Sequence, residues 1–327
     1  MKRNLQFGSF FITLFIAFGL ISVPAAPAAA LEAQVTISYV KSPFNLQSIV
    51  MKEHQLLEKE LAPLGVSVNW VEINSGARQA QALAAGDMDV AGVMNSTSLL
   101  MGVSEGLPLK YVAGVARPTD LFAIIGRPDK FGKSDGPTSI ANLKGKTVVG
   151  PMGTVLHQLL AAALAREGLS VKDVRFVSMD IPQSFAALQS GQADAALLAG
   201  NMIIKAEAEG APKLATAAGL VTPKLGLVAT DDFIANHPDR LRAVIAAHDK
   251  AWSWIEENHA EAMALGAKIQ GISLEEAELF FAWSHFTQRM SAADIESMKD
   301  DMQFLLDNNM MRRPVEVETL FIPQALE

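Results

Sequence analysis

Cysteine is absent from all 327 residues of the chain. The protein therefore has no disulfide, no thiol nucleophile and no thiolate with which to ligate zinc. Its six histidines are scattered, without the spacing that metal ligands need. H-E-x-x-H and P-loop patterns are also missing. These absences exclude thiol, zincin and P-loop chemistry, and we expect no catalytic activity, no metal and no cofactor.

The N-terminus has the three parts of a secretory signal peptide. Lys2 and Arg3 give a positive start, an uncharged apolar stretch follows over residues 10–23, and Ala28 and Ala30 fit the small-x-small rule. A membrane anchor is the alternative, but the apolar stretch is shorter than the roughly 20 residues that a spanning helix needs. We therefore expect cleavage after Ala30. Without a cysteine to carry a lipid, the exported protein is expected to diffuse freely in a periplasm.

Acidic residues outnumber basic ones, and the formal net charge is −8. The N-terminal segment contributes two cations and no acid, so the remainder of the chain is more acidic still. A chain with this balance is a poor partner for nucleic acid. The net charge does not identify a small ligand, because nearby groups set the electrostatic field inside a cleft.

Segments with strand and helix patterns alternate along the chain, which predicts βαβ units around mainly parallel sheets and an α/β fold. Beyond residue 238 the pattern is mostly helical. The predicted strands are 35–40, 66–73, 88–93, 109–115, 147–149, 174–179 and 193–198. The predicted helices are 48–61, 77–85, 96–104, 154–167, 183–190, 201–209, 238–258, 273–283 and 291–308.

Two stretches repeat one pattern, 82–91 and 187–196. Each has the end of a helix, a glycine, a short turn with an aspartate and an apolar strand. Two copies predict two similar lobes, because a solenoid would need more repeats. We expect a signal peptide at 1–30, a discontinuous first lobe at 31–117 and 221–327, and a second lobe at 118–220.

Several motifs resemble one family of binding proteins. They are Met94–Thr97, the segment 140–148 (IANLKGKTV), Gly153–His157 (GTVLH) and Gly191–Ala195 (GQADA). Together they resemble the sulfonate/nitrate/taurine-type substrate-binding proteins of ABC importers, which are close in fold to thiamine-precursor binders. The resemblance implies a two-lobe periplasmic binding protein fold of type II-like arrangement. It also implies a monomer that delivers a small ligand to an ABC permease with a cytoplasmic ATPase.

One departure from that family bears on the ligand. Members that bind aliphatic sulfonates often carry a Trp-Asp/Gly-Pro segment where this chain has Ala199-Gly200-Asn201. The missing indole and carboxylate count against taurine and leave room for a bulkier ligand. Nitrate, an aromatic carboxylate or sulfonate, and a thiamine precursor remain open, as does a role as a ligand-presenting sensor. Pyrimidine-forming enzymes of thiamine synthesis share the architecture, but the cysteine-rich motif associated with them is absent.

Polar turns precede many of the predicted helices, where the carboxyl ends of strands meet at one edge of a sheet. Helix N-termini expose unpaired N–H groups and a partial positive charge, so several directed at one cleft would bind an anion. Each polar residue has an alternative role as a helix cap. The alternative role of Arg117 is an interlobe salt bridge, and that of Phe44 and His157 is packing. The candidate ligand contacts are Ser42, Phe44, Asn45, Ser75, Gly76, Asn95, Ser96, Thr97, Arg117, Thr154, His157, Asp180 and Asn201.

Overall fold

Two five-stranded sheets organise the chain in a computed structural model that describes residues 33–128 and 136–327. The expected signal peptide lies outside the described residues. Sheet A has the order β2-β1-β3-β10-β4 and sheet B the order β7-β6-β8-β5-β9. The strands of sheet A are β1 (Gln34–Tyr39), β2 (Ser67–Glu72), β3 (Val90–Asn95), β4 (Leu109–Ala116) and β10 (Leu225–Thr230). Those of sheet B are β5 (Phe122–Gly126), β6 (Thr147–Gly150), β7 (Arg175–Ser178), β8 (Ala195–Ala199) and β9 (Lys213–Thr216).

The two sheets repeat one topology, and each is mixed in direction rather than mainly parallel. Strand β1 pairs in parallel with β2 and β3, as β6 does with β7 and β8. Strand β10 is antiparallel to β3 and β4, and β5 is antiparallel to β8 and β9. The antiparallel strand is in each case the first one after the chain crosses from the other sheet. The α/β fold is therefore confirmed, whereas the lobe limits at 117 and 221 stay a prediction.

Helices cover the sheets and begin close to the predicted positions. The predicted helix at 48–61 is divided, because Gln55 takes a left-handed backbone with φ of 53°. The helices up to residue 208 are α1 (Leu46–Glu53), α2 (Leu56–Leu61), α3 (Gly76–Ala85), α4 (Ser96–Ser104), α5 (Val155–Arg166), α6 (Ile181–Gln189) and α7 (Asn201–Ala208). The later ones are α8 (Asp231–Asn236), α9 (Pro238–Glu257), α10 (His259–Gln270), α11 (Leu274–Ser284) and α12 (Ala292–Asp307).

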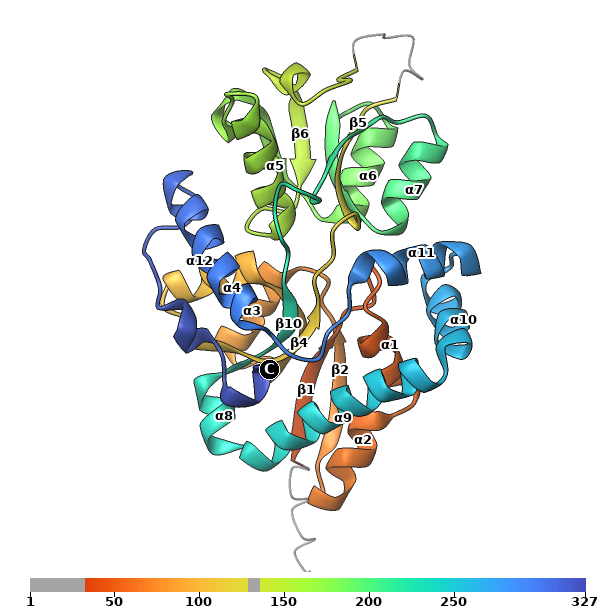
Figure 1. The fold of residues 1–327 in the computed structure, drawn as a ribbon, viewed down its shortest axis with the longest axis vertical. Helices are drawn as coiled ribbons and strands as arrows, with labels where there is room; N and C mark the ends of the chain where they lie inside the picture. Colours follow the sequence, from red (N-terminus) through yellow and green to blue (C-terminus); the bar gives the residue numbers. More distant parts are fainter. Residues whose placement is uncertain (1–32, 129–135) are drawn as a thin grey trace, which may run out of the picture. The chain divides into compact units, whose positions relative to one another are not determined.

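The C-terminal helices pack beside sheet A. Helix α9 packs on α1 and α2, and α12 packs on α4 (Figure 1). In sheet B the neighbouring residues Leu197 and Leu198 belong to different apolar clusters, because successive side chains of a strand point to opposite faces. Both faces of sheet B are therefore buried, which suits strands that read as continuous apolar runs. Within the described residues, no helix is long and apolar enough to cross a membrane.

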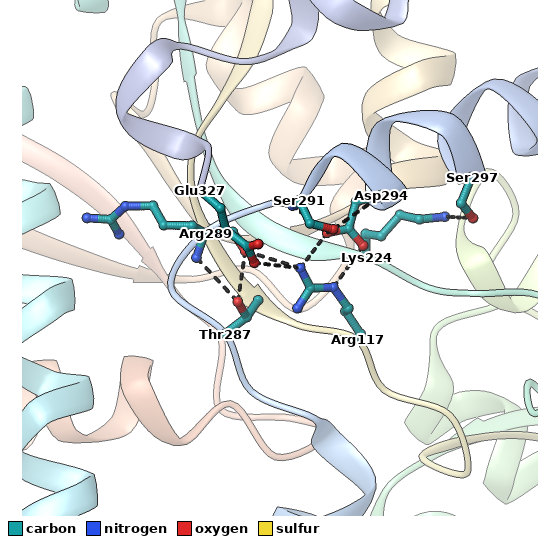
Figure 2. Close-up of polar contacts among 8 residues, drawn as sticks. All are labelled: Arg117, Lys224, Thr287, Arg289, Ser291, Asp294, Ser297 and Glu327. Carbon is teal, nitrogen blue, oxygen red and sulfur yellow. Dashed lines mark hydrogen bonds and ion pairs between the residues drawn. The ribbon is translucent and has the colours of Figure 1, made fainter.

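One face of α12 contacts both chain segments that connect the two sheets, which we call the first and second crossings. Asp294, Ser297 and Asp301 are spaced i, i+3 and i+7, so they lie along one side of the helix. Arg117, on the first crossing, donates from Nε to Asp294 Oδ1 at 2.8 Å and also pairs with Oδ2 (Figure 2). Lys224, on the second crossing, donates from Nζ to Ser297 Oγ and to Asp301 Oδ2, each at 2.7 Å. Helix α12 therefore fixes the two connecting segments at once.

Candidate functional site

A cavity of about 400 Å³ lies where helices from both sheets begin. It is lined from six helices, α1, α3 and α4 beside sheet A and α5, α6 and α7 beside sheet B. Each of these helices contributes its N-cap residue or its first helical residue, namely Asn45, Ser75, Asn95, Thr154, Asp180 and Asn201. Helix N-termini present free N–H groups and partial positive charge, so the cavity offers several anion-binding ends.

The capping side chains leave most of these ends open. Asn95 is a true cap, since its Oδ1 accepts from Ser98 N at 2.9 Å. The side chains of Ser75, Thr154 and Asp180 form no such hydrogen bond to α3, α5 and α6. Thr154 instead donates to the Pro151 carbonyl at 2.9 Å. The first-turn N–H groups of these three helices therefore remain free of side-chain caps, as an anion site requires.

Glycines allow the loops around the cavity to approach closely. A Cβ on Gly76 would lie 2.7 Å from Ser98 Oγ and 2.8 Å from Asn95 Nδ2, so only glycine lets the starts of α3 and α4 meet. Gly200 has φ of 56°, and a Cβ there would lie 2.8 Å from the Pro43 carbonyl oxygen. The turn that precedes α7 is thereby packed on the turn that precedes α1.

Apolar side chains complete the lining of the cavity. They include Phe122, Leu156, Ile181, Met202 and Leu225, which come from both sheets and their following helices. Among the described residues, no group of histidine, aspartate and glutamate side chains could hold a metal ion. A ligand that matches this lining has an anionic or polar head and an apolar body.

Eight of the thirteen predicted contact residues line this cavity, and five do not. Those that line it are Ser42, Asn45, Ser75, Gly76, Asn95, Thr154, Asp180 and Asn201. Phe44 packs its ring on Phe280 at a centroid distance of 5.9 Å, inside the core around sheet A. Ser96 and Thr97 are buried, and Thr97 donates to Gln158. Arg117 pairs with Asp294, which has a place in the same predicted lobe, so its role is structural but is not the interlobe salt bridge.

His157 lies in the first turn of α5 but does not reach the cavity. Its ring stacks on Phe176 with centroids 4.8 Å apart, and it is only 8% exposed. Neither ring nitrogen has a hydrogen-bond partner among the described residues. Burial lowers the pKa of His157 to about 4, so the ring is neutral at neutral pH. The structure gives His157 a packing role.

Three charged side chains line the cavity, Glu72, Arg78 and Asp180, and only Asp180 is predicted from sequence. Glu72 forms an ion pair with Lys41, with Oε1 and Nζ 3.3 Å apart. Partial burial acts to raise the pKa of Glu72, but hydrogen bonds from Asn74 and Lys41 lower it overall. Arg78 pairs with Asp180 at 3.0 Å. The sequence could have indicated Arg78, because a cation in the first turn of a helix opposes the helix dipole and is unexpected for stability alone.

Comparison with known proteins places these features in a family. The family described as NMT1/THI5 like matches residues 62–262. The putative aliphatic sulfonates-binding protein of Escherichia coli (strain K12) is 30% identical over 179 residues. That stretch is 54% of this chain and 53% of the relative, about half the length of each.

Solved structures share the fold across nearly the whole chain. The alkanesulfonate-binding protein SsuA from Xanthomonas axonopodis pv. citri, bound to MOPS, has a TM-score of 0.77 and 23% identity, and the match covers 90% of this chain and 99% of that one. The desulfurization enzyme DSZB has a TM-score of 0.62 and 16% identity, with 89% and 97% covered. The fold therefore occurs in binding proteins and in an enzyme, and the site must decide between these functions.

Proposed function

This chain belongs to the NMT1/THI5-like family, and from that premise we propose that it is the periplasmic solute-binding component of an ABC importer. Its ligand is a small organic anion, an aliphatic or aromatic sulfonate first of all. The observation that carries the proposal is the cavity at which six helices begin. An anionic head group bound there would accept hydrogen bonds from the first-turn N–H groups of α3, α5 and α6.

The size and lining of the cavity favour an anion with an apolar body. Nitrate would leave most of the roughly 400 Å³ unfilled and has no apolar surface to bury against Phe122 or Met202. Taurine has a short body and an ammonium group, and the Trp-Asp segment typical of related sulfonate binders is absent. Longer alkanesulfonates and arylsulfonates fit the lining better, because burying their apolar surface adds to affinity.

Both sheets contribute to the lining, which supports a transport cycle based on closure of two lobes. A ligand that contacts Ser75 on one side and Thr154 on the other would stabilise the closed arrangement. The ligand-bound monomer would then dock on a permease with a cytoplasmic ATPase. Residues proposed to contact the ligand are Ser42, Asn45, Ser75, Gly76, Asn95, Thr154, Asp180 and Asn201.

The proposal includes no catalytic step. The E. coli relative is named as a binding protein, and the enzyme with this fold is only 16% identical to this chain. The chain also has no cysteine to act as a nucleophile. Hydrogen bonding to an anion at helix N-termini requires no proton transfer, so binding alone accounts for the residues at the cavity.

A binding panel tests the proposal. The chain, expressed with its N-terminal segment and purified, is unfolded and refolded to remove any bound ligand. It is then heated with hexanesulfonate, benzenesulfonate, taurine, nitrate, benzoate or a thiamine pyrimidine precursor. A ligand at 100 times its dissociation constant adds about 2.7 kcal/mol of stability, a readily measured shift. We expect the two longer sulfonates to give the largest shifts.

An occluding variant distinguishes the cavity from other binding sites. Asn201→Trp places an indole at the start of α7, where it fills part of the cavity, and should abolish the shift. The matched control is Asn236→Trp on the exposed end of α8, which should leave the shift unchanged. A parent protein that responds to none of the anions, or an Asn201→Trp variant that responds fully, contradicts the proposed function.

A further inference from the structure

The ion pair between Arg78 and Asp180 joins the two halves of the cavity wall. Arg78 is the third residue of α3, beside sheet A, and Asp180 is the N-cap of α6, beside sheet B. Their closest atoms, Nη2 and Oδ2, are 3.0 Å apart. Both residues line the cavity at the helix starts, where the anionic head of a ligand is expected. Each of these charges is therefore close enough to affect ligand binding.

Helix stability does not explain the charge of Arg78 at its position. A cation in the first turn of α3 opposes the helix dipole. Asp180 makes no cap hydrogen bond to α6, although an aspartate N-cap normally does. The pair is also poorly suited to stabilise the fold, because the side chains are 65% and 37% exposed. Their shared feature is the presence of opposite charges on opposite sides of one cavity.

The pair sets the charge balance of the cavity, since Glu72, the only other charged lining residue among those that the structure describes, is paired with Lys41. While Arg78 and Asp180 remain paired, the wall carries no uncompensated side-chain charge. The helix N-termini then supply the only net positive potential, which suits one anionic group. Loss of Arg78 would expose a carboxylate to the ligand, and loss of Asp180 would expose a guanidinium.

We propose that the Arg78–Asp180 pair determines the charge type of the ligand and selects mono-anions over zwitterions and dianions. This inference rests on the proposed function, because it concerns selectivity at the same cavity. Arg78 compensates Asp180, whose carboxylate alone would repel an anionic head and attract an ammonium group. Asp180 in turn compensates Arg78, whose guanidinium alone would pair with a second acidic group.

Three ligands of equal chain length provide the test. Propanesulfonate is a mono-anion, aminopropanesulfonate a zwitterion and propanedisulfonate a dianion. Dissociation constants are measured by calorimetry for the parent chain, Arg78→Gln, Asp180→Asn and the double variant. Circular dichroism checks that each variant is folded. Exposed charges change affinities by up to about fivefold, and we expect shifts of that size.

The expected changes have opposite directions in the two single variants. Arg78→Gln lowers affinity for propanesulfonate and shifts the ratio about fivefold toward the zwitterion. Asp180→Asn shifts the ratio by a similar factor toward the disulfonate. The double variant restores the parent ranking, because neither charge is then uncompensated. Raising the salt concentration reduces both shifts, since screening weakens interactions between exposed charges.

A second exposed ion pair, Lys110–Asp231 at 2.9 Å, provides the control, because neither residue lines the cavity. Lys110→Gln should leave all three affinities unchanged. A parent chain that binds none of the three ligands overturns this inference, and one that also responds to no anion in the binding panel overturns the proposed function as well. A parent chain that binds propanesulfonate while the ligand ratios stay equal in every variant overturns this inference alone.

Discussion

Two regions of the molecule join distant parts of the chain through charged side chains, and they differ in burial. At the cavity, Arg78 and Asp180 are 65% and 37% exposed. At α12, the side chain of Lys224 from the second crossing is fully buried and that of Asp301 is 12% exposed. Water screens the first pair, so removing one of its partners costs the fold little. In the second pair, removing one partner leaves a buried charge without compensation.

This difference in burial distinguishes the pair proposed to select the ligand from the pair that supports the fold. Selecting a ligand needs charges that face it, and the exposed pair at the cavity wall provides them. Holding two crossings in fixed positions needs lasting contacts, and α12 supplies these through Asp294 and Asp301. The same residue types therefore have different roles, and burial decides which.

Asp301→Asn is expected to have the largest effect on stability. It leaves the Lys224 ammonium buried without its carboxylate, which costs about 3–5 kcal/mol of unfolding free energy. Urea unfolding followed by circular dichroism measures the loss. Asp300→Asn changes the exposed neighbour on the same helix and should lie within about 0.5 kcal/mol of the parent. Equal stability of the two variants would show that the buried pair does not support the fold.

His157 makes stability depend on pH. Its pKa is about 4 in the folded chain, against 6.5 for the free side chain, so the unfolded chain binds more protons between these values. The stabilisation is complete above pH 6.5 and is lost as pH falls through about 4. The His157→Phe variant keeps the stacking on Phe176 and has no proton to bind. As pH falls over this range, the unfolding free energy of the variant should decrease by about 3 kcal/mol less than that of the parent.

Urea unfolding of both proteins at a series of pH values measures that difference. Between pH 7 and pH 8 His157 is neutral in both states, so the gap between parent and variant should be constant there. Parallel curves over the acid range would mean that the His157 ring is hydrated or protonated in the folded chain.

Asn95 combines both roles, because it caps α4 and lines the cavity. Asn95→Ala should cost about 1 kcal/mol of stability and also weaken sulfonate binding. Ser273→Ala removes a cap from α11 by the same chemistry, away from the cavity. It should cost a similar amount of stability and leave affinity unchanged. If both variants bind as the parent does, Asn95 is a cap alone.

The smallest effect on stability is expected from Arg78→Gln. An exposed pair contributes about 0–1 kcal/mol, so the unfolding free energy measured with urea should change by less than about 1 kcal/mol. The change in ligand selectivity proposed for this variant would then occur without a change in the fold. A loss comparable to that of Asp301→Asn would remove the distinction between the two regions.

Local pattern predicted much of the fold, because most elements follow from periodicity and from caps near their own ends. The helix at 96–104 begins and ends as predicted, and the Ser291–Asp294 capping pattern forms at α12. Strands β5, β9 and β10 were missed. Each is short and pairs with a strand that is distant in sequence, so no local alternation marks it.

The candidate site was predicted to the extent that it depends on helix starts. Polar residues at the carboxyl ends of strands do meet at one cavity, as with Ser75 and Thr154. Side chains whose partners are remote could not be placed. Arg117 pairs with Asp294, 177 residues later, and no local feature distinguishes that contact from a contact with an anion. Arg78 was overlooked because its significance depends on Asp180, which belongs to the other half of the chain.

The most direct test of anion binding at the helix starts is a nitrogen–proton correlation spectrum of the deuterated chain during titration with propanesulfonate. We expect saturable shifts that are largest at the amides of Gly76 and Ala77 in α3 and of Val155 and Leu156 in α5. These N–H groups would donate to the sulfonate oxygens. Saturation with shifts confined to other regions, or no shift at all, would contradict the assignment of this cavity as an anion site.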